Sequence, residues 1–329
     1  MINAPSPSGP TAFGHTLTGE RVDRITLSDG QLTVCLLALG VTLQGLWLTG
    51  VPHSLTLGCG TVAAYQTAGS YLGALVGPVA NRIGGAEATI NDRCCQFAAN
   101  EGTNTLHSGP DGLHNRIWHL ADYDATAATF TLSLPAGDSG FPGNRRISAR
   151  YSLHPNATLR LEISVITDAL TPISIADHSY WNLDGTGDWS GHSLQIAADH
   201  WLPVTVQGLP TGARMPTIAE MNFAQSRTIQ PGSPALDHNF CLANARRPLT
   251  FTARLTGASG VTLALSTTEP GLQIYDGRSP IRPGDVPYAG LALEPQGWPD
   301  ALHQPSFPSI LASPASPYHQ TTQWQFSRT

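Results

Sequence analysis

The stretch "ATLRLEISVIT", residues 157–167, alternates apolar and polar side chains from Leu159 to Val165. Successive side chains of a β-strand point to opposite faces of the sheet, so this period of two is expected for a strand with one buried face. The turn-forming residues "LHPN" (153–156) stand directly before it. The stretch therefore predicts an amphipathic strand that follows a tight turn.

The same alternation recurs along the chain, whereas long windows with helical periodicity are absent. The best short helix candidate is "TVAAYQTAG", residues 61–69. Many short strands joined by turns predict an all-β protein, a large antiparallel sandwich or barrel with few short helices. The other runs with this pattern are residues 31–48, 128–134, 147–153, 261–267 and 322–327.

The organisation of the chain indicates one domain. No internal repeat, low-complexity segment or convincing linker interrupts the 329 residues. Residues 1–12 are Pro-rich and are predicted to form a loose N-terminal segment, followed by a single domain over residues 13–329. The Pro-rich segment 279–287 is predicted to be a surface loop between two strands.

Composition limits the classes of partner. Charged residues make up 12% of the chain, all 17 basic residues are Arg, and the formal net charge is −6 with a pI near 6.0. These values predict no basic face for nucleic acid or for an anionic membrane surface. Neither a signal-peptide pattern nor a long apolar stretch is present in the sequence, so a cytoplasmic protein is expected.

The Cys residues and the familiar nucleotide motifs point to no cofactor chemistry. The five Cys residues form no CxxC motif and no Cys/His cluster, and all of them, including the vicinal pair Cys94 and Cys95, are predicted to be reduced core thiols. No GxGxxG, Walker-type loop or GxSxG occurs in a strand-to-helix setting. Dinucleotide, nucleotide and serine-hydrolase functions are therefore disfavoured.

Glu294 lies at the end of the apolar run in "LALEPQGWPD", residues 291–300. A carboxylate in a half-buried strand loses solvation, so it is expected either to have a partner that stabilises its charge or to have a functional role. In "GLQIYDG", residues 271–277, alternation places Gln273 on the face opposite to Leu272 and Ile274. The same alternation predicts that Gln273 and Glu294 face one groove.

His178 stands in "ISIADHSYWNLDG", residues 173–185, close to Tyr180 and Trp181. A histidine exchanges protons near neutral pH and can act as a general acid. Aromatic neighbours provide a floor on which a sugar ring stacks, although they are equally typical of a packed core. Together with Glu294, His178 forms a candidate acid–base pair over a sugar-like floor.

Four further polar residues follow strand-like runs or turns. The planar guanidinium of Arg82 is suited to sugar hydroxyls or a carboxylate, and the alternative is an Arg that bridges a loop to a nearby Asp. Asp237 is either a ligand or part of an Asx-turn or salt bridge, and His107 is either a ligand or a satisfied structural histidine. The four residues are Asn81 and Arg82 in "GPVANRIGG", His107 in "NTLHSG" and Asp237 in "LDHNF".

Several of these motifs, taken together and in order, resemble those of the aldose 1-epimerase (galactose mutarotase) family. The resemblance runs from about residue 56 to the C-terminus and rests on "ANRIGG", "NTLHSG", "GFPGN", "DHSYWNL", "LDHNF", "GLQIYDG" and "LALEPQGWPDA". It implies a β-supersandwich, no metal or organic cofactor, and interconversion of the α and β anomers of a free aldose. A small-molecule sugar is then the partner, bound to a monomer or homodimer.

The resemblance also implies roles for the site residues. Glu294 is expected to be the general base and His178 the general acid, one on each side of the sugar ring. Desolvation by the preceding apolar run should raise the pKa of Glu294 and make it a stronger base. The implied ligands of the sugar hydroxyls are Arg82, His107, Asp237 and Gln273, with Asn81 as a weaker candidate.

Two other functions remain open from the sequence. One is a mutarotase of sugar phosphates, which needs extra cations, and Arg278 and Arg282 are the candidates. The other is a non-catalytic carbohydrate-binding module on the same scaffold. The presence of both Glu294 and His178 argues against the module, because binding alone requires neither an acid nor a base.

The chain departs from the usual family motifs at positions that are expected to alter the sugar preference. If the carboxylate of Asp177 lies near the imidazole of His178, it should favour the protonated form of that histidine. Asp276 and the following Arg278 are expected near the groove. The departures are Pro78, Ser108, Asp177, Asp276 and His303.

Overall fold

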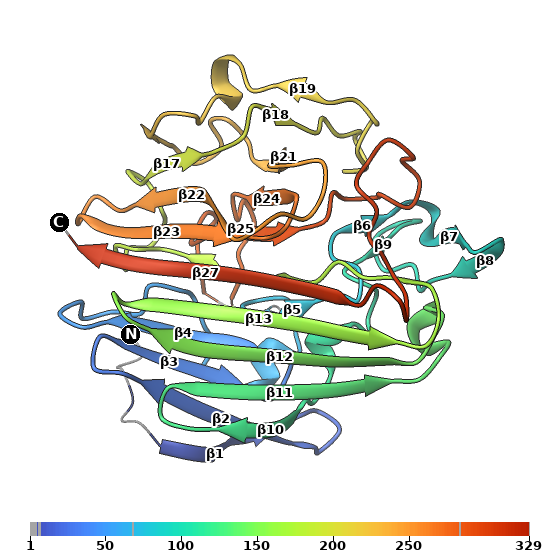
Figure 1. The fold of residues 1–329 in the computed structure, drawn as a ribbon. Coiled ribbons are helices and arrows are strands. Elements are labelled where there is room, and N and C mark those ends of the chain that lie inside the picture. Colours follow the sequence, from blue (N-terminus) through green and yellow to red (C-terminus); the bar gives the residue numbers. More distant parts are fainter. Residues whose placement is uncertain (1–4, 6–7, 68, 283, 329) are drawn as a thin grey trace.

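Antiparallel sheets dominate the computed structural model, which describes the chain except residues 1–4, 6–7, 68, 283 and 329 (Figure 1). Within the described residues, the largest sheet has nine strands. In sheet order they are β10 (His119–Tyr123), β11 (Ala127–Leu134), β12 (Arg145–His154), β13 (Thr158–Thr167), β27 (Tyr318–Arg328), β23 (Val261–Thr267), β22 (Thr250–Thr256), β17 (Ser193–Ile196) and β20 (Arg227–Thr228).

A six-stranded sheet packs against this layer and carries the groove. Figure 1 shows β24 and β25 behind β22 and β23, and apolar side chains of these strands share one core. In order, the sheet contains β16 (Tyr180–Trp181), β25 (Leu291–Gln296), β24 (Gly271–Tyr275), β21 (Asp237–Cys241), β18 (His200–Trp201) and β19 (Met215–Pro216).

The remaining elements are a four-stranded sheet, short strand pairs and single helical turns. The four-stranded sheet contains β1 (Ser8–His15), β2 (Arg21–Ser28), β3 (Leu32–Leu37) and β4 (Thr42–Leu48). The pairs are β14 (Thr171–Pro172) with β26 (Leu311–Ala312), β15 (Ala176–Asp177) with β5 (Leu75–Val76), β6 (Arg82–Ile83) with β9 (Thr105–Leu106), and β7 (Glu87–Ile90) with β8 (Arg93–Gln96). The helices are α1 (Val62–Tyr65) and the 3₁₀ turns Gly84–Ala86, Leu113–Asn115, Asp138–Gly140 and Ala219–Met221.

The all-β prediction is confirmed, and β13 shows its physical reason. Leu159, Leu161 and Ile163 are buried, whereas the intervening Glu162 is exposed. The strand pairs with β12 on one side and β27 on the other. One face of the layer therefore packs onto the core and the other faces solvent, which is the arrangement that a period of two predicts.

The run 31–48 forms two strands instead of one. A turn between β3 and β4 separates them, and Gly40 adopts a left-handed conformation there with φ of 63°. A Cβ atom at this position would lie 2.6 Å from the carbonyl oxygen of His114. Glycine allows both the positive φ and this close approach, so the chain reverses and β3 pairs with β4.

Two details of the prediction differ from the structure. Residues 8–12 of the predicted loose segment belong to β1 and pair with β2, while residues 1–4 and 6–7 lie outside the described residues. The five thiols are free, but Cys94 is exposed and Cys95 partly exposed, so the prediction of core thiols is wrong for this pair. The reason is that β7 and β8 form a separate two-stranded hairpin whose outer side faces solvent.

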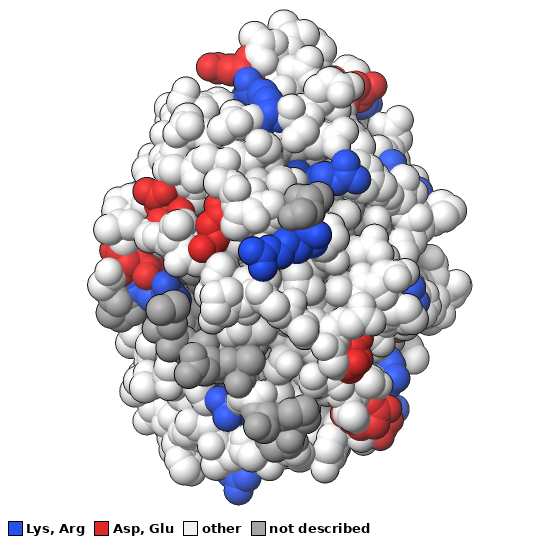
Figure 2. All heavy atoms as spheres, turned by 90° about the vertical axis from the view of Figure 1, so that its left-hand side faces the viewer, with Lys and Arg blue, Asp and Glu red and all other residues white. Residues whose placement is uncertain are grey.

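Charged side chains are sparse on the face shown in Figure 2, where acidic and basic residues form small, separate groups. This distribution agrees with a chain in which 12% of the residues are charged. None of the helices in the described part of the chain has the length and apolar character needed to cross a membrane.

Candidate active site

A cavity of about 330 Å³ lies on the face of the six-stranded sheet formed by β21, β24 and β25. We call it the inner cavity. It brings together all seven site residues that the sequence analysis singled out, although they come from separate segments of the chain. Its lining comprises Tyr71, Asn81, Arg82, Glu101, Leu106, His107, His178, Tyr180, Asp237, Gln273, Tyr275, Arg278, Ser279 and Glu294.

Glu294 is placed by the pairing of β25 with β24. Its register partner is Gln273, and both side chains point into the inner cavity, as the alternation along the two strands predicts. Glu294 is 2% exposed, and its Oε2 accepts no hydrogen bond from any residue that the structure describes. Burial, reinforced by the negative charge of Asp237, raises the pKa of Glu294 well above its usual value.

His178 lies beside Glu294. Its Nε2 atom is 3.5 Å from Glu294 Oε2, and its ring stacks on Tyr180 with the ring centres 5.0 Å apart. Burial lowers the pKa of His178 to about 4. The expectation that the acid and the base flank the ring from opposite sides is therefore wrong, because the two groups are neighbours on one wall.

The condition under which Asp177 would favour protonated His178, a carboxylate near the imidazole, is not met. Adjacent side chains of an extended segment point to opposite sides, so the carboxylate of Asp177 faces away from the inner cavity. It accepts hydrogen bonds from the Tyr151 hydroxyl at 2.6 Å and from the Ser179 backbone N–H at 3.0 Å. Burial raises the pKa of Asp177 to about 6.

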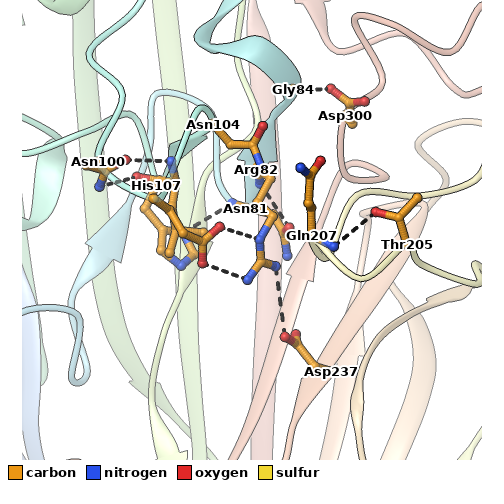
Figure 3. A network of polar contacts seen from close by, with 12 residues as sticks. Asn81, Arg82, Gly84, Asn100, Asn104, His107, Thr205, Gln207, Asp237 and Asp300 are labelled. Carbon is orange, nitrogen blue, oxygen red and sulfur yellow. Dashed lines mark hydrogen bonds and ion pairs between the residues drawn. The ribbon is translucent and has the colours of Figure 1, made fainter.

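Arg82 is held in place by two carboxylates. Its Nε and Nη2 atoms donate to Glu101 at 2.6 and 2.9 Å, and its Nη1 lies 3.9 Å from Asp237 Oδ2. Figure 3 shows the guanidinium directed toward Asp237. Both interpretations of Arg82 from the sequence therefore apply. Arg82 forms an ion pair with Glu101 in a nearby turn, and it also lines the inner cavity.

His107 and Asn81 form a backbone-fixed pair. The Asn81 N–H donates to His107 Nδ1 at 3.1 Å, and the His107 N–H donates to the Asn81 carbonyl at 3.0 Å. An accepting Nδ1 in a neutral imidazole requires that Nε2 carries the proton. Burial keeps the ring neutral by lowering the pKa of His107 well below its usual value. His107 therefore presents a neutral N–H donor.

Asp237 and Gln273 complete the polar wall. Gln273 Nε2 donates to Asp237 Oδ1 at 2.7 Å, so the amide fixes one carboxylate oxygen and leaves the other directed toward Arg82. Gln273 is 3% exposed, which means that its position is determined by packing as well as by this bond. The wall offers both donors and acceptors, as hydroxyl groups require.

Sequence reasoning missed two members of this site, one aromatic and one charged. Tyr71 packs against His107 and His114 with ring centres 4.7 Å apart in both cases, and it lines the inner cavity. Glu101 orients Arg82. Neither Tyr71 nor Glu101 belongs to a polar cluster in the sequence, and only the fold brings them to the groove. Arg278 was expected near the groove, and it lines the cavity while its Nε donates to the buried Asp276 at 2.9 Å.

The inner cavity also contains a possible set of metal ligands. Ligand atoms of His107, His178 and Glu294 all lie within 4.8 Å of one another. While His107 Nδ1 accepts the Asn81 N–H and Nε2 holds the ring proton, neither ring nitrogen offers a lone pair to a cation. Two ligands remain, which is fewer than the three protein ligands typical of a catalytic zinc site.

Comparisons with known proteins agree with this geometry. The family model described as aldose 1-epimerase matches residues 23–325. The chain is 32% identical to the galactose mutarotase of Rattus norvegicus, over 96% of this chain and 98% of the relative, and 31% identical to the aldose 1-epimerase of Escherichia coli (strain K12), over 91% and 93%.

Solved structures show the same fold. An aldose epimerase homologue from C. elegans superimposes with a TM-score of 0.87 at 26% identity, covering 94% of this chain and 99% of the other. The galactose 1-epimerase from Lactobacillus acidophilus gives a TM-score of 0.83 at 25% identity, with 97% and 98% covered. Fold and site together define a mutarotase-like β-supersandwich enzyme. The chain belongs to the aldose 1-epimerase family.

Proposed function

We propose that this protein is an aldose 1-epimerase, an isomerase that interconverts the α and β anomers of a free aldose by acid–base ring opening and closure. The observation that carries the proposal is the placement of Glu294 and His178. Both side chains are almost completely buried, and their reactive atoms are 3.5 Å apart at the inner cavity. Membership of the family supports the reaction.

The pair is suited to a reaction centred on one carbon. Ring opening removes the proton from the hydroxyl oxygen on the anomeric carbon and protonates the ring oxygen, which is bonded to the same carbon. Neighbouring proton-transfer groups reach these two oxygens from one side. Glu294 accepts the hydroxyl proton and His178 donates to the ring oxygen; the open aldehyde then rotates and closes on its other face with the proton transfers reversed.

Burial favours one position for the proton that Glu294 and His178 share. The raised pKa of Glu294 and the lowered pKa of His178 favour a neutral pair, with the shared proton on Glu294. The reactive form has the same number of protons and differs only in that the proton lies on His178. The positive charge of Arg82 lowers the pKa of Glu294 and so favours this reactive form.

Sugar binding is assigned to the rest of the wall. The paired strands β6 and β9 and the residues next to them carry Asn81, Arg82 and His107. The neighbouring strands β21 and β24 carry Asp237 and Gln273, respectively. Arg82 and the neutral His107 N–H supply donors, while Asp237 supplies an acceptor. Tyr71 and Tyr180 provide aromatic faces against which the apolar side of a sugar ring packs.

The charges favour a free aldose over a sugar phosphate. Arg82 is paired with Glu101 and Asp237, and Arg278 is paired with the buried Asp276. Arg282, the other candidate cation, is paired with Asp285 and lines a different cavity. A dianionic phosphate would have to break one of these ion pairs, whereas sugar hydroxyls hydrogen-bond to them as they stand.

The test is the rate of anomer equilibration, followed by polarimetry or proton NMR on fresh α-anomers of D-glucose, D-galactose, L-arabinose and D-xylose. Wild type should accelerate at least one of them. Glu294→Gln should not, and Glu162→Gln, an equivalent change at an exposed position on β13, should retain wild-type rates. Acceleration of glucose 6-phosphate alone would support the sugar-phosphate function, and no acceleration of any sugar would support a binding module.

Three further expectations, on domain organisation, cellular location and assembly, belong to the same proposal. Residues 13–329 are proposed to work as one supersandwich domain, the protein is proposed to be cytoplasmic, and its assembly is proposed to be a monomer or a homodimer. Gel filtration with light scattering measures the assembly, and limited proteolysis reports whether the chain is divided into separate units.

A further inference from the structure

Arg82 lies on a strand pair that stands apart from the large sheets. Within the part of the chain that the structure describes, β6 carries Arg82 and pairs only with β9, through two residues on each strand. Glu294 lies instead on β25, in the six-stranded sheet. Because the two strands belong to different sheets, sheet pairing does not fix the backbone of Arg82 relative to Glu294. Contacts between loops have to do so.

The segment that follows β25 makes this connection. The Gly297 N–H donates to Ser174 Oγ at 3.0 Å, and Trp298 Nε1 donates to the Pro270 carbonyl at 2.8 Å, so the chain leaves the strand in a fixed direction. Asp300 comes two residues after Trp298. It is 6% exposed and has φ of 54°, a left-handed conformation that Asp adopts more readily than most residues.

Asp300 binds the backbone of β6 on both sides of Ile83. The Asp300 N–H donates to the Arg82 carbonyl at 3.2 Å, and the Gly84 N–H donates to Asp300 Oδ1 at 2.9 Å. Figure 3 shows the second of these contacts in the same polar network as Arg82. Since Glu101 binds the guanidinium separately, both the backbone and the side chain of Arg82 are held.

His303 orients the carboxylate of Asp300. Its Nδ1 atom lies 2.6 Å from Asp300 Oδ1, the oxygen that also accepts the Gly84 N–H, and the His303 N–H donates to the Asp300 carbonyl at 2.9 Å. A carboxylate oxygen only accepts, so Nδ1 carries the proton in this contact. The hydrogen bond to Asp300 raises the pKa of His303 above its usual value. The imidazole is therefore a donor that keeps the carboxylate directed toward β6.

We propose that Asp300 and His303 are positioning residues for Arg82, and that they determine how tightly a sugar binds in the inner cavity. Neither residue lines that cavity, so their effect passes through the backbone of residues 82–84. The inference rests on the proposed mutarotase function and adds two residues that act on sugar binding without touching the sugar.

The experiment measures kcat and KM for the preferred aldose in two pairs of variants. Asp300→Gly removes the carboxylate and still accepts a positive φ, whereas Asp300→Asn retains an acceptor oxygen. His303→Leu removes the donor, whereas His303→Asn retains an N–H close to the position of Nδ1. We expect Asp300→Gly and His303→Leu to raise KM by about threefold to tenfold with kcat little changed, and both Asn variants to stay near wild type.

Asp184→Gly is the matched control. Asp184 accepts the N–H groups of Ala258 and Ser259 at 2.8 and 3.0 Å and lies 3.6 Å from His192 Nδ1, but it does not line the inner cavity. The variant removes a comparable link between distant segments, so it should lower Tm to a similar extent and leave KM unchanged. A thermal melt of every variant accompanies the kinetics.

The outcomes separate positioning from stability and from the underlying function. A rise in KM that the Asn variants reverse and the control lacks supports the inference. It is overturned by an unchanged KM in Asp300→Gly or His303→Leu, by a rise that the Asn variants do not reverse, or by an equal rise in Asp184→Gly. If Asp300→Gly does not fold, the His303 variants decide by the same criteria. If wild type accelerates no sugar, the mutarotase function fails, and dissociation constants from NMR titrations of the same variants test the positioning separately; sugars that do not bind either overturn both.

Discussion

Glu294 Oε2 and His178 Nε2 lie 3.5 Å apart, although the two residues belong to distant segments of the chain. The pairing of β16 with β25 explains this contact. Tyr180 is opposite Ala292 in that antiparallel register, and continuing it by two residues brings position 178 opposite position 294. The same strand presents Glu294 to Gln273 on its other side. One carboxylate is thus placed by two neighbouring strands.

Glu294→Gln should separate catalysis from binding and stability. The amide keeps the shape of the side chain but cannot accept a proton, so we expect kcat to fall by about 10²- to 10⁴-fold while sugar still binds. Polarimetry and an NMR titration with the preferred sugar measure the two properties. Turnover near that of wild type would remove Glu294 from the role of base.

The stability of the same variant tests the burial of the carboxylate. The folded-state pKa of Glu294 is raised above its unfolded value, so its contribution to stability is full at low pH and is lost as pH rises through the folded-state pKa. Glu294→Gln removes this loss and should have a higher Tm than wild type in alkaline buffer. A lower Tm there would contradict the assignment.

His178→Asn should abolish activity without unfolding the protein. We expect a loss of about 10²- to 10⁴-fold in kcat, because Asn cannot donate a proton to the ring oxygen. Circular dichroism and a thermal melt report the fold beside the kinetic assay. If the variant fails to fold, His178 is a core residue that packs on Tyr180, and its role as acid is lost.

The pH profile of kcat/KM should have a broad plateau across neutral pH. The pair works while it holds one proton in total. It gains a second proton near the pKa of His178, about 4, and loses its proton at the raised pKa of Glu294, so the rate falls below the first value and above the second. An acid limb centred near pH 6.5, the usual value for histidine, would show that His178 is not desolvated.

Glu101→Gln should weaken sugar binding through Arg82. The charged bidentate contact is lost and the guanidinium becomes less well oriented, so we expect KM to rise by about threefold to tenfold with kcat little changed. Asp138→Asn, which weakens an Arg–carboxylate contact made by Arg116 Nη2 outside the inner cavity, is the control. An equal rise in KM in both variants would point to a general loss of stability.

Asp177→Asn should flatten the pH dependence of stability. The pKa of Asp177 is raised from 3.8 to about 6, so its folded form binds a proton that the unfolded chain releases. Stability is therefore full below pH 4 and declines by about 2–3 kcal/mol as pH rises to 7. Urea unfolding at several pH values measures the free energy. If the free energy of unfolding of the variant fell with pH as steeply as that of wild type, another buried group would dominate the pH dependence.

Local patterns predicted much of the site. Alternation along residues 271–275 and 291–296 was enough to place Gln273 and Glu294 on one face, because side-chain direction in a strand depends only on position. The turn motifs identified Asn81, Arg82 and His107. The partner of Arg82 was not predictable, since Glu101 reaches it through the fold of a separate turn.

The sequence by itself determined the period of the strands, the faces of their side chains and the family of the protein, because each depends on local order or on motifs in a fixed succession. Only the tertiary structure decided that His178 lies beside Glu294, that Asp177 faces Tyr151, and that Glu101 binds Arg82. These contacts depend on which strands pair and how sheets pack, and such non-local choices leave no period in the sequence.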